Sequence, residues 1–129
     1  MEASMNFCDY FHVLVQHAAI HMDAIRDTLT HDVMKGTFSL DKAADFLESS
    51  KMKAESIEKQ LSSILTTQAD LEAFAGVMKQ CVENMQVLQK AIDARKNDPV
   101  SLLEAKNAMA NLSGWIFGLE FVILQANLS

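Results

Sequence analysis

Apolar residues recur along most of this chain in steps of three and four, the spacing that places side chains on one side of an α-helix. Four segments follow this rule, at about 5–35, 40–65, 70–96 and 100–127. The first stripe consists of Cys8, Phe11, Val15, Ala18, Met22, Ile25 and Leu29. The others run from Leu40 to Ile64, from Leu71 to Ile92 and from Leu102 to Ala126. One stripe can arise by chance, whereas four in succession indicate four amphipathic helices.

Capping residues mark most of the expected helix ends. Gly36 suits the left-handed position that closes a helix, and Ser39 suits the N-cap of the second helix. Asp98 and Pro99 together break the chain and start the last helix. The second connection has neither glycine nor proline, but extending the stripe of the second segment through it would place Gln68 and Gln89 in the core. The pattern therefore breaks there, and Thr66 or Thr67 can cap a new helix. The alternative is one long helix from 40 to 96.

Composition and helix length together define the fold class. Half of the 129 residues are hydrophobic, and there are only one proline and four glycines, too few turn residues for a β-sandwich. Three short connections between long helices force each helix to run antiparallel to the next. The sequence therefore predicts a single all-α domain over 1–129, an antiparallel up-down-up-down four-helix bundle.

Net charge and targeting features narrow the environment. The formal charge of −6 disfavours nonspecific binding to nucleic acid or to anionic membranes, because both require a basic face. The chain starts without a basic region, and its longest apolar stretch, 115–124, is too short to span a bilayer. Cys8 and Cys81 form no disulfide framework. We expect a soluble cytoplasmic protein without nucleic-acid or membrane partners.

The first and last helices carry a second apolar stripe outside the core positions. A helix that is apolar nearly all round is buried on both sides. These two helices are neighbours in an up-down-up-down bundle, so the two extra stripes would merge into one exposed patch of the kind that marks association. The expected interaction surface comprises Tyr10, Val13, His17, Ile20, Leu103, Phe117, Phe121 and Leu124. The alternative is a thicker core covered by the chain termini.

All four histidines lie in the first segment, and two of them have metal-ligand spacing. His17 and His21 are four residues apart, which places two imidazoles on one helix face. The Glu-x-x-His pattern of di-iron helical bundles is absent from the sequence, and no other segment contains a histidine. A metal-binding bundle that uses His17 and His21 is therefore an alternative function, with the metal ion as its only cofactor.

Glu120 is the one charge within the apolar stretch 115–124, where an unpaired carboxylate is costly. If the first and last helices are antiparallel and paired with an index sum of 132, His12 lies level with Glu120. We therefore expect His12 and Glu120 to form a buried polar pair.

The segment Arg26-Asp-Thr-Leu-Thr-His31 resembles the Arg-four-residues-His motif of HEPN ribonucleases. Those proteins are helical and dimeric, and they cleave RNA at the dimer interface. The resemblance covers six residues and implies a ribonuclease in which Arg26 and His31 act on RNA. The sequence favours instead a non-enzymatic interaction module without a cofactor, a small regulator, adaptor or chaperone-like protein. It would form a homodimer or dock a partner helix through its first and last helices.

Overall fold

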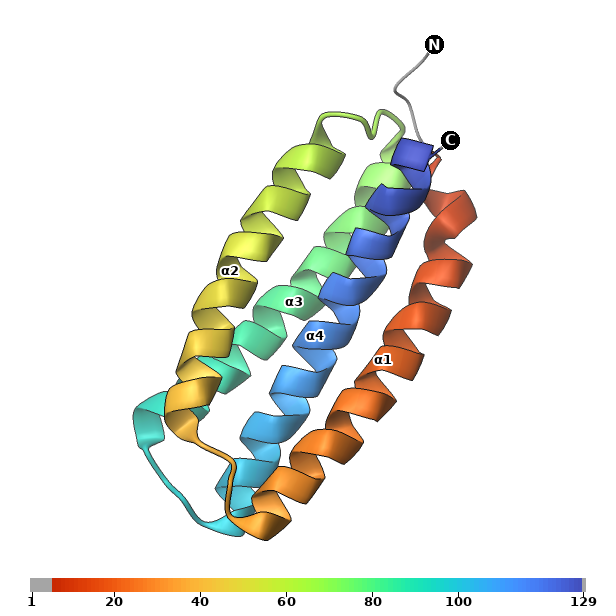
Figure 1. Cartoon of the computed structure of the whole chain (residues 1–129). Coiled ribbons are helices and arrows are strands. Elements are labelled where there is room, and N and C mark those ends of the chain that lie inside the picture. The colour runs from red at the N-terminus through yellow and green to blue at the C-terminus, as the bar shows by residue number, and fades with distance from the viewer. Residues whose placement is uncertain (1–5, 129) are drawn as a thin grey trace.

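The computed structural model describes residues 6–128 as four α-helices joined by three short connections. These are α1 (Phe7–Lys35), α2 (Leu40–Ser62), α3 (Gln68–Ala94) and α4 (Pro99–Leu128). Each helix runs antiparallel to the next, so α1 begins and α4 ends at the same end of the molecule (Figure 1). The predicted up-down-up-down four-helix bundle is confirmed. The alternative of one helix from 40 to 96 is wrong, because the chain leaves the helical conformation between α2 and α3.

Local capping explains where the helices begin and end. Ser39 accepts hydrogen bonds from the backbone N–H groups of Asp41 and Lys42, and Gly36 closes α1 with a φ of 76°. Thr67, one of the two residues expected to cap α3, accepts a 3.1 Å hydrogen bond from the backbone N–H of Asp70. These bonds satisfy backbone groups that a helix terminus leaves without partners.

A buried carboxylate from α3 caps the N-terminus of α1. The Asn6 side chain makes no capping bond, and the backbone N–H of Cys8 instead donates a 2.9 Å hydrogen bond to Asp70, which is 2 % exposed. Burial raises the pKa of Asp70, but hydrogen bonds from Cys8, Thr67 and Phe7 outweigh burial and hold that pKa below its usual value. The ionised carboxylate therefore joins α1 to α3 through two residues that are 62 positions apart in the sequence.

The core contains most of the predicted stripes of α2, α3 and α4. In α2 every stripe residue from Ala43 to Leu61 is buried, Ser50 included. Leu88 is fully buried, but Leu71 is 40 % exposed because Asp70 occupies the inward position at the start of α3. The four helices surround one cluster of apolar side chains, into which Phe38 of the first connection also packs.

The predicted stripe of α1 is rotated by about one residue. Phe11 and Val15, which we expected in the core, are 38 % and 37 % exposed, whereas Phe7 and Leu14 are fully buried. One residue corresponds to about 100° around the helix axis. Apolar residues form two adjacent stripes along α1, so the sequence pattern alone did not fix which stripe faces the core. Ala18 belongs to both faces and is buried as expected.

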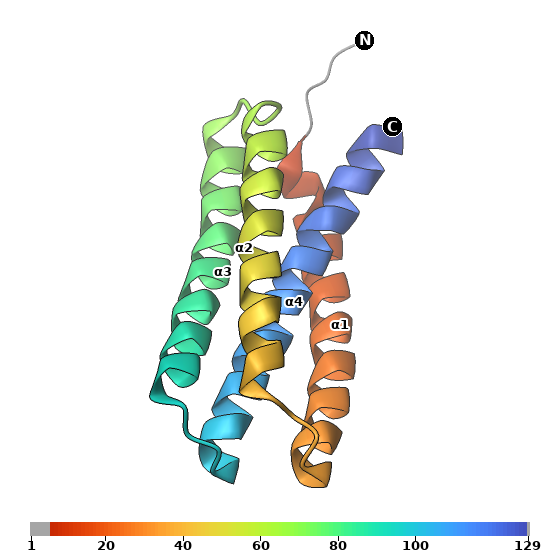
Figure 2. The same ribbon diagram turned by 60° about the vertical axis from the view of Figure 1, so that its left-hand side comes forward.

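Both α3 and α4 contact all three other helices, but α4 packs more extensively, above all against α1, and is therefore the central element. Its residues Pro99–Ala126 are long and apolar enough to cross a membrane by length and composition. Half of its most apolar 18-residue stretch is buried in the structure. The core helix of a helical bundle has the same length and composition, so the evidence for a membrane span is weak. Helix α4 is apolar on nearly all of its sides because it packs against three neighbouring helices (Figure 2).

Two glycines bring the backbones of α1 and α4 together. A Cβ at Gly114 would lie 2.8 Å from the carbonyl oxygen of Ala18 and would also collide with Met22. A Cβ at Gly118 would lie 3.0 Å from the carbonyl oxygen of Leu14. Helix α1 of the same chain therefore fills the space that both glycines leave open.

Gly114→Ala should destabilise the fold by about 1–3 kcal/mol, because the carbonyl of Ala18 is backbone and can yield only if α1 shifts. Gly76→Ala is the matched control, a helical glycine with no heavy atom within 4 Å of the added Cβ. It should stabilise the fold by about 0.5–1 kcal/mol. Urea unfolding measures both, and equal effects of the two substitutions would contradict the close helix approach.

Asp70→Asn should lower the free energy of unfolding at pH 7 by about 1–3 kcal/mol, because it removes the charge from the cap of α1. The folded-state pKa lies below the ordinary value of 3.8, so this stabilisation is present above that pH and is lost as the pH falls below it. The difference between the variant and the unmutated chain should therefore be smaller in urea melts at pH 3 than at pH 7. A difference that persists unchanged at pH 3 would show that the charge is not the cause.

Candidate functional site

A groove separates α1 from α2. Within residues 6–128 these two helices make no contact, although both pack against α4. In a square bundle they would be neighbours, whereas here α2 leans toward α4. One side of α4 therefore faces an open sector, with α1 as one wall and α2 as the other.

Two adjoining pockets lie along this groove, one of about 310 Å³ lined by α1, α2 and α4 and one of about 270 Å³ lined by α2 and α4 alone. Lys53 of α2 and Glu120 of α4 line both pockets and therefore mark the boundary between them. They are the only lysine, arginine, aspartate or glutamate side chains in the lining of either pocket. The apolar lining comprises Ile25, Phe46, Ile57, Ile116, Phe117, Ile123 and Leu124. The groove is thus mainly apolar, with one positive and one negative charge near its middle.

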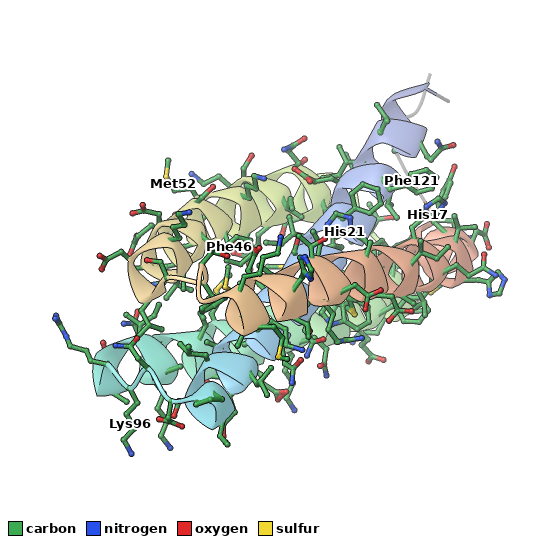
Figure 3. All side chains as sticks on the ribbon, turned by 60° about the horizontal axis from the view of Figure 1, so that its bottom comes forward. His17, His21, Phe46, Met52, Lys96 and Phe121 are labelled. Atoms are coloured by element: carbon green, nitrogen blue, oxygen red, sulfur yellow. The ribbon has the colours of Figure 1, made fainter. Side chains whose placement is uncertain are left out.

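Stacked rings join α1 to α4 along one edge of the groove. The ring of His17 stacks on Phe121 with centroids 4.0 Å apart, and the ring of His21 stacks on Phe117 with centroids 4.4 Å apart and an interplanar angle of 7°. Figure 3 shows His17 beside Phe121, with His21 and Phe46 on opposite walls. Phe117 remains 38 % exposed, so the stack covers only one face of its ring.

His21 also makes a polar contact across the two helices. Its Nε2 shares a 2.9 Å hydrogen bond with Ser113 Oγ. Burial lowers the pKa of His21 below its usual value, against a smaller opposing effect of the Glu120 carboxylate. A serine next to a histidine can form part of a hydrolytic site, but Ser113 lies inside α4, where the helix already uses the backbone N–H groups. No oxyanion hole can form from them, and the contact acts structurally.

Some residues of the predicted interaction surface lie together, whereas others pack against the core of the same chain or lie apart. His17, Phe117 and Phe121 do come together, and Ile20 and Leu124 are 70 % and 54 % exposed. Tyr10 is partly buried and packs against the core, Val13 is half-buried, and Leu103, 36 % exposed, lies outside the groove lining. Whether these residues bind a partner stays a prediction.

The expected buried pair of His12 and Glu120 is wrong. Both side chains are exposed, and no hydrogen bond joins them in the described part of the chain. The expected index sum of 132 is correct, since Leu14 faces Gly118 and Ala18 faces Gly114. The error is rotational, because residues at one level can point in opposite directions. The Glu120 carboxylate acts on His21, whose pKa it raises against the larger opposite effect of burial.

The two alternative sites gain little from the geometry. His17 and His21 face phenylalanine rings, and among the described residues no group of three His, Cys, Asp or Glu side chains could hold a metal ion. Arg26 binds Asp23 at 2.9 Å and Asn111 at 3.2 Å, while His31 is exposed. The Arg26 guanidinium thus belongs to a structural contact between α1 and α4.

That contact is one of several hydrogen bonds that join α4 to its neighbours α1 and α3. Asn111 donates to Asn84 of α3 at 3.3 Å, and buried Lys106 donates to Thr30 of α1 at 2.9 Å. Sequence reasoning missed these partners, because asparagine, threonine and lysine at helix positions are ordinary surface residues. It also missed the wall contributed by α2, since Phe46 lies beside the α2 core stripe and Lys53 looks solvated.

Comparisons of this chain with protein families, with curated proteins and with solved structures find no match. Function therefore has to be argued from the groove itself.

His21→Gln should make stability less dependent on pH. The folded state holds the pKa of His21 below the ordinary value of 6.5, so it resists protonation. The unfolded chain then binds more protons as the pH falls below 6.5, and stability is lost progressively until the pH is below the folded pKa. Urea melts at pH 7.5 and pH 5 should differ less for His21→Gln than for the unmutated chain. A pH dependence as large in His21→Gln as in the unmutated chain would show that His21 is not its source.

Proposed function

We propose that this protein is a non-enzymatic interaction module that binds the apolar face of a helix in the groove between α1 and α2. The occupant helix would lie on α4 and contact both walls. It belongs either to another copy of the chain or to a partner protein. The docking of an amphipathic helix in an apolar groove is a recurring mode of recognition, and small regulators, adaptors and chaperone-like proteins are the classes that we consider.

The observation that supports the proposal is the exposed apolar surface of α4 between two helices that do not touch each other. Phe117 and Leu124 are 38 % and 54 % exposed at the floor, and Ile20 is 70 % exposed on the adjoining ridge of α1. Water penalises such surface by roughly 25 cal/mol per Å², so burying several hundred Å² favours association by several kcal/mol before entropy is counted.

The shape of the groove favours a helix over a small ligand. It is open to solvent and extends over two adjoining pockets along α4, and its two charges offset each other. A helix that lies parallel to α4 would complete the packing around it, since α1, α2 and α3 already occupy the other sides. The wall histidines are committed to ring stacking and to Ser113, which supports binding over metal chemistry.

A fluorescent peptide can test the groove directly. The probe is a neutral amphipathic peptide of about five helical turns with one leucine stripe, followed by anisotropy at low protein concentration. Phe117→Glu should weaken its binding by about tenfold or more, because a charge is placed on the apolar floor. Leu71→Glu is the matched control, since Leu71 is 40 % exposed on α3 and lies outside the groove.

Circular dichroism and thermal melts of both variants establish that the helices remain folded. Equal binding by Phe117→Glu and Leu71→Glu, or no binding by the unmutated chain, would reject the groove as a helix-docking site.

A further inference from the structure

The part of the groove that is lined by α1, α2 and α4, which we call the three-helix pocket, has room for one large side chain. Its volume is about 310 Å³. Phe46 and Phe117 contribute aromatic rings to the lining, and Ile25 and Ile116 contribute aliphatic chains. Figure 3 shows Phe46 of α2 and His21 of α1 on opposite walls. An apolar cavity of roughly 150 Å³ holds a benzene ring, so the three-helix pocket can hold an aromatic side chain.

A buried hydroxyl in the wall of this pocket has no partner. Ser50 of α2 is 3 % exposed and lines the pocket, yet it forms no hydrogen bond in the described part of the chain. Within residues 6–128, every buried side-chain nitrogen or oxygen that solvent cannot reach has a partner. Solvent therefore reaches the Ser50 hydroxyl, and it does so through the pocket. The other two uncharged polar residues of the lining, His21 and Ser113, already share a 2.9 Å hydrogen bond.

A helix that covers the groove removes water from the Ser50 hydroxyl. A buried hydroxyl without a partner costs free energy, so an occupant that supplies a hydrogen-bonding group binds more tightly than a purely apolar one. That group should be uncharged, because exposed Lys53 and Glu120 line the same pocket and neither forms an ion pair with a described residue. A carboxylate would be attracted by Lys53 and repelled by Glu120, and the reverse holds for an ammonium group.

Tyrosine is the side chain that meets both requirements. Its aromatic ring suits the apolar lining, and its hydroxyl can both donate a hydrogen bond to Ser50 and accept one from it. Tyrosine is also among the residues that most often anchor protein interfaces in a buried pocket.

A second copy of this chain does not offer such an anchor. The chain contains one tyrosine, Tyr10. Its side chain is partly buried and packs against the core of its own molecule. A tyrosine that enters the groove must therefore belong to another protein.

We propose that the helix bound in the groove comes from a different protein and inserts a tyrosine into the three-helix pocket, where its hydroxyl forms a hydrogen bond with Ser50. This inference rests on the proposed function and names the anchor residue of the partner. The ring lies among Phe46, Ile116 and Phe117, and the exposed charges of Lys53 and Glu120 lie at the rim of the contact.

Peptide anisotropy tests the anchor. Three versions of the leucine-stripe peptide carry leucine, phenylalanine or tyrosine at the central stripe position. The tyrosine peptide should bind the unmutated chain about fivefold more tightly than the phenylalanine peptide, because only tyrosine can form a hydrogen bond with Ser50. Ser50→Ala should bring the two affinities to within about twofold. Ser49→Ala is the matched control, an exposed serine outside the groove, and should keep the fivefold ratio.

Equal affinities of the two peptides for the unmutated chain, or a fivefold ratio that survives Ser50→Ala, would overturn the proposal. Ser50→Ala removes a hydroxyl without a partner from a buried position, so it should keep or raise the melting temperature of the unmutated chain.

Isotope-filtered NMR of the unmutated chain with the tyrosine peptide locates the ring without any substitution in the protein. The tyrosine ring protons should show nuclear Overhauser contacts to the methyl groups of Ile25 and Ile116, which line the three-helix pocket. Contacts to Ile123 of the adjoining pocket, without contacts to Ile25, would overturn the proposal.

The two proposals fail differently. If the leucine peptide binds but the tyrosine and phenylalanine peptides bind equally, the groove binds a helix without this anchor, and only the tyrosine anchor is wrong. If none of the three peptides binds the unmutated chain, the proposed function is wrong as well.

Discussion

The close approach of α1 and α4 is the constraint on which the rest of the structure depends. The backbone of α1 passes over Gly114 and Gly118, and no larger residue fits at Gly114 without moving the carbonyl of Ala18. Only this short separation allows the flat rings of His17 and His21 to stack on Phe121 and Phe117. The helix pair then acts as one rigid unit against which the other two helices pack.

Polar contacts fix how that unit sits on α3. Asp70 caps α1 from the start of α3, and Asn111 of α4 links Arg26 of α1 to Asn84 of α3. Buried polar groups need partners, so each contact is available in one arrangement only. No comparable polar contact ties α1 to α2 in the described part of the chain, which is consistent with the open sector between them.

The groove follows from the central position of α4. A helix that is apolar nearly all round needs cover on every side, and three neighbours leave one side uncovered. The uncovered side carries Phe117, Glu120 and Leu124. The apolar character that makes α4 the core helix therefore also leaves apolar side chains exposed on this side.

The sequence alone determined the number of helices, their order and most of the core, because the three-four spacing of residues such as Leu47, Ile57 and Leu88 is a local property of each segment. The sequence also predicted the level at which α1 and α4 face each other, an index sum of 132. The contact between Leu14 and Gly118 confirms that level. Rotation about the helix axis was decided only by tertiary packing. In α1 two lines of apolar residues compete, and the choice depends on where α4 can come closest, which is set by two glycines about a hundred residues away. That rotation exposed Phe11 and His12, directed His17 and His21 onto phenylalanines, and left Ile20 outside. Spacing fixes which residues share a face, but the partner helix decides which way that face points.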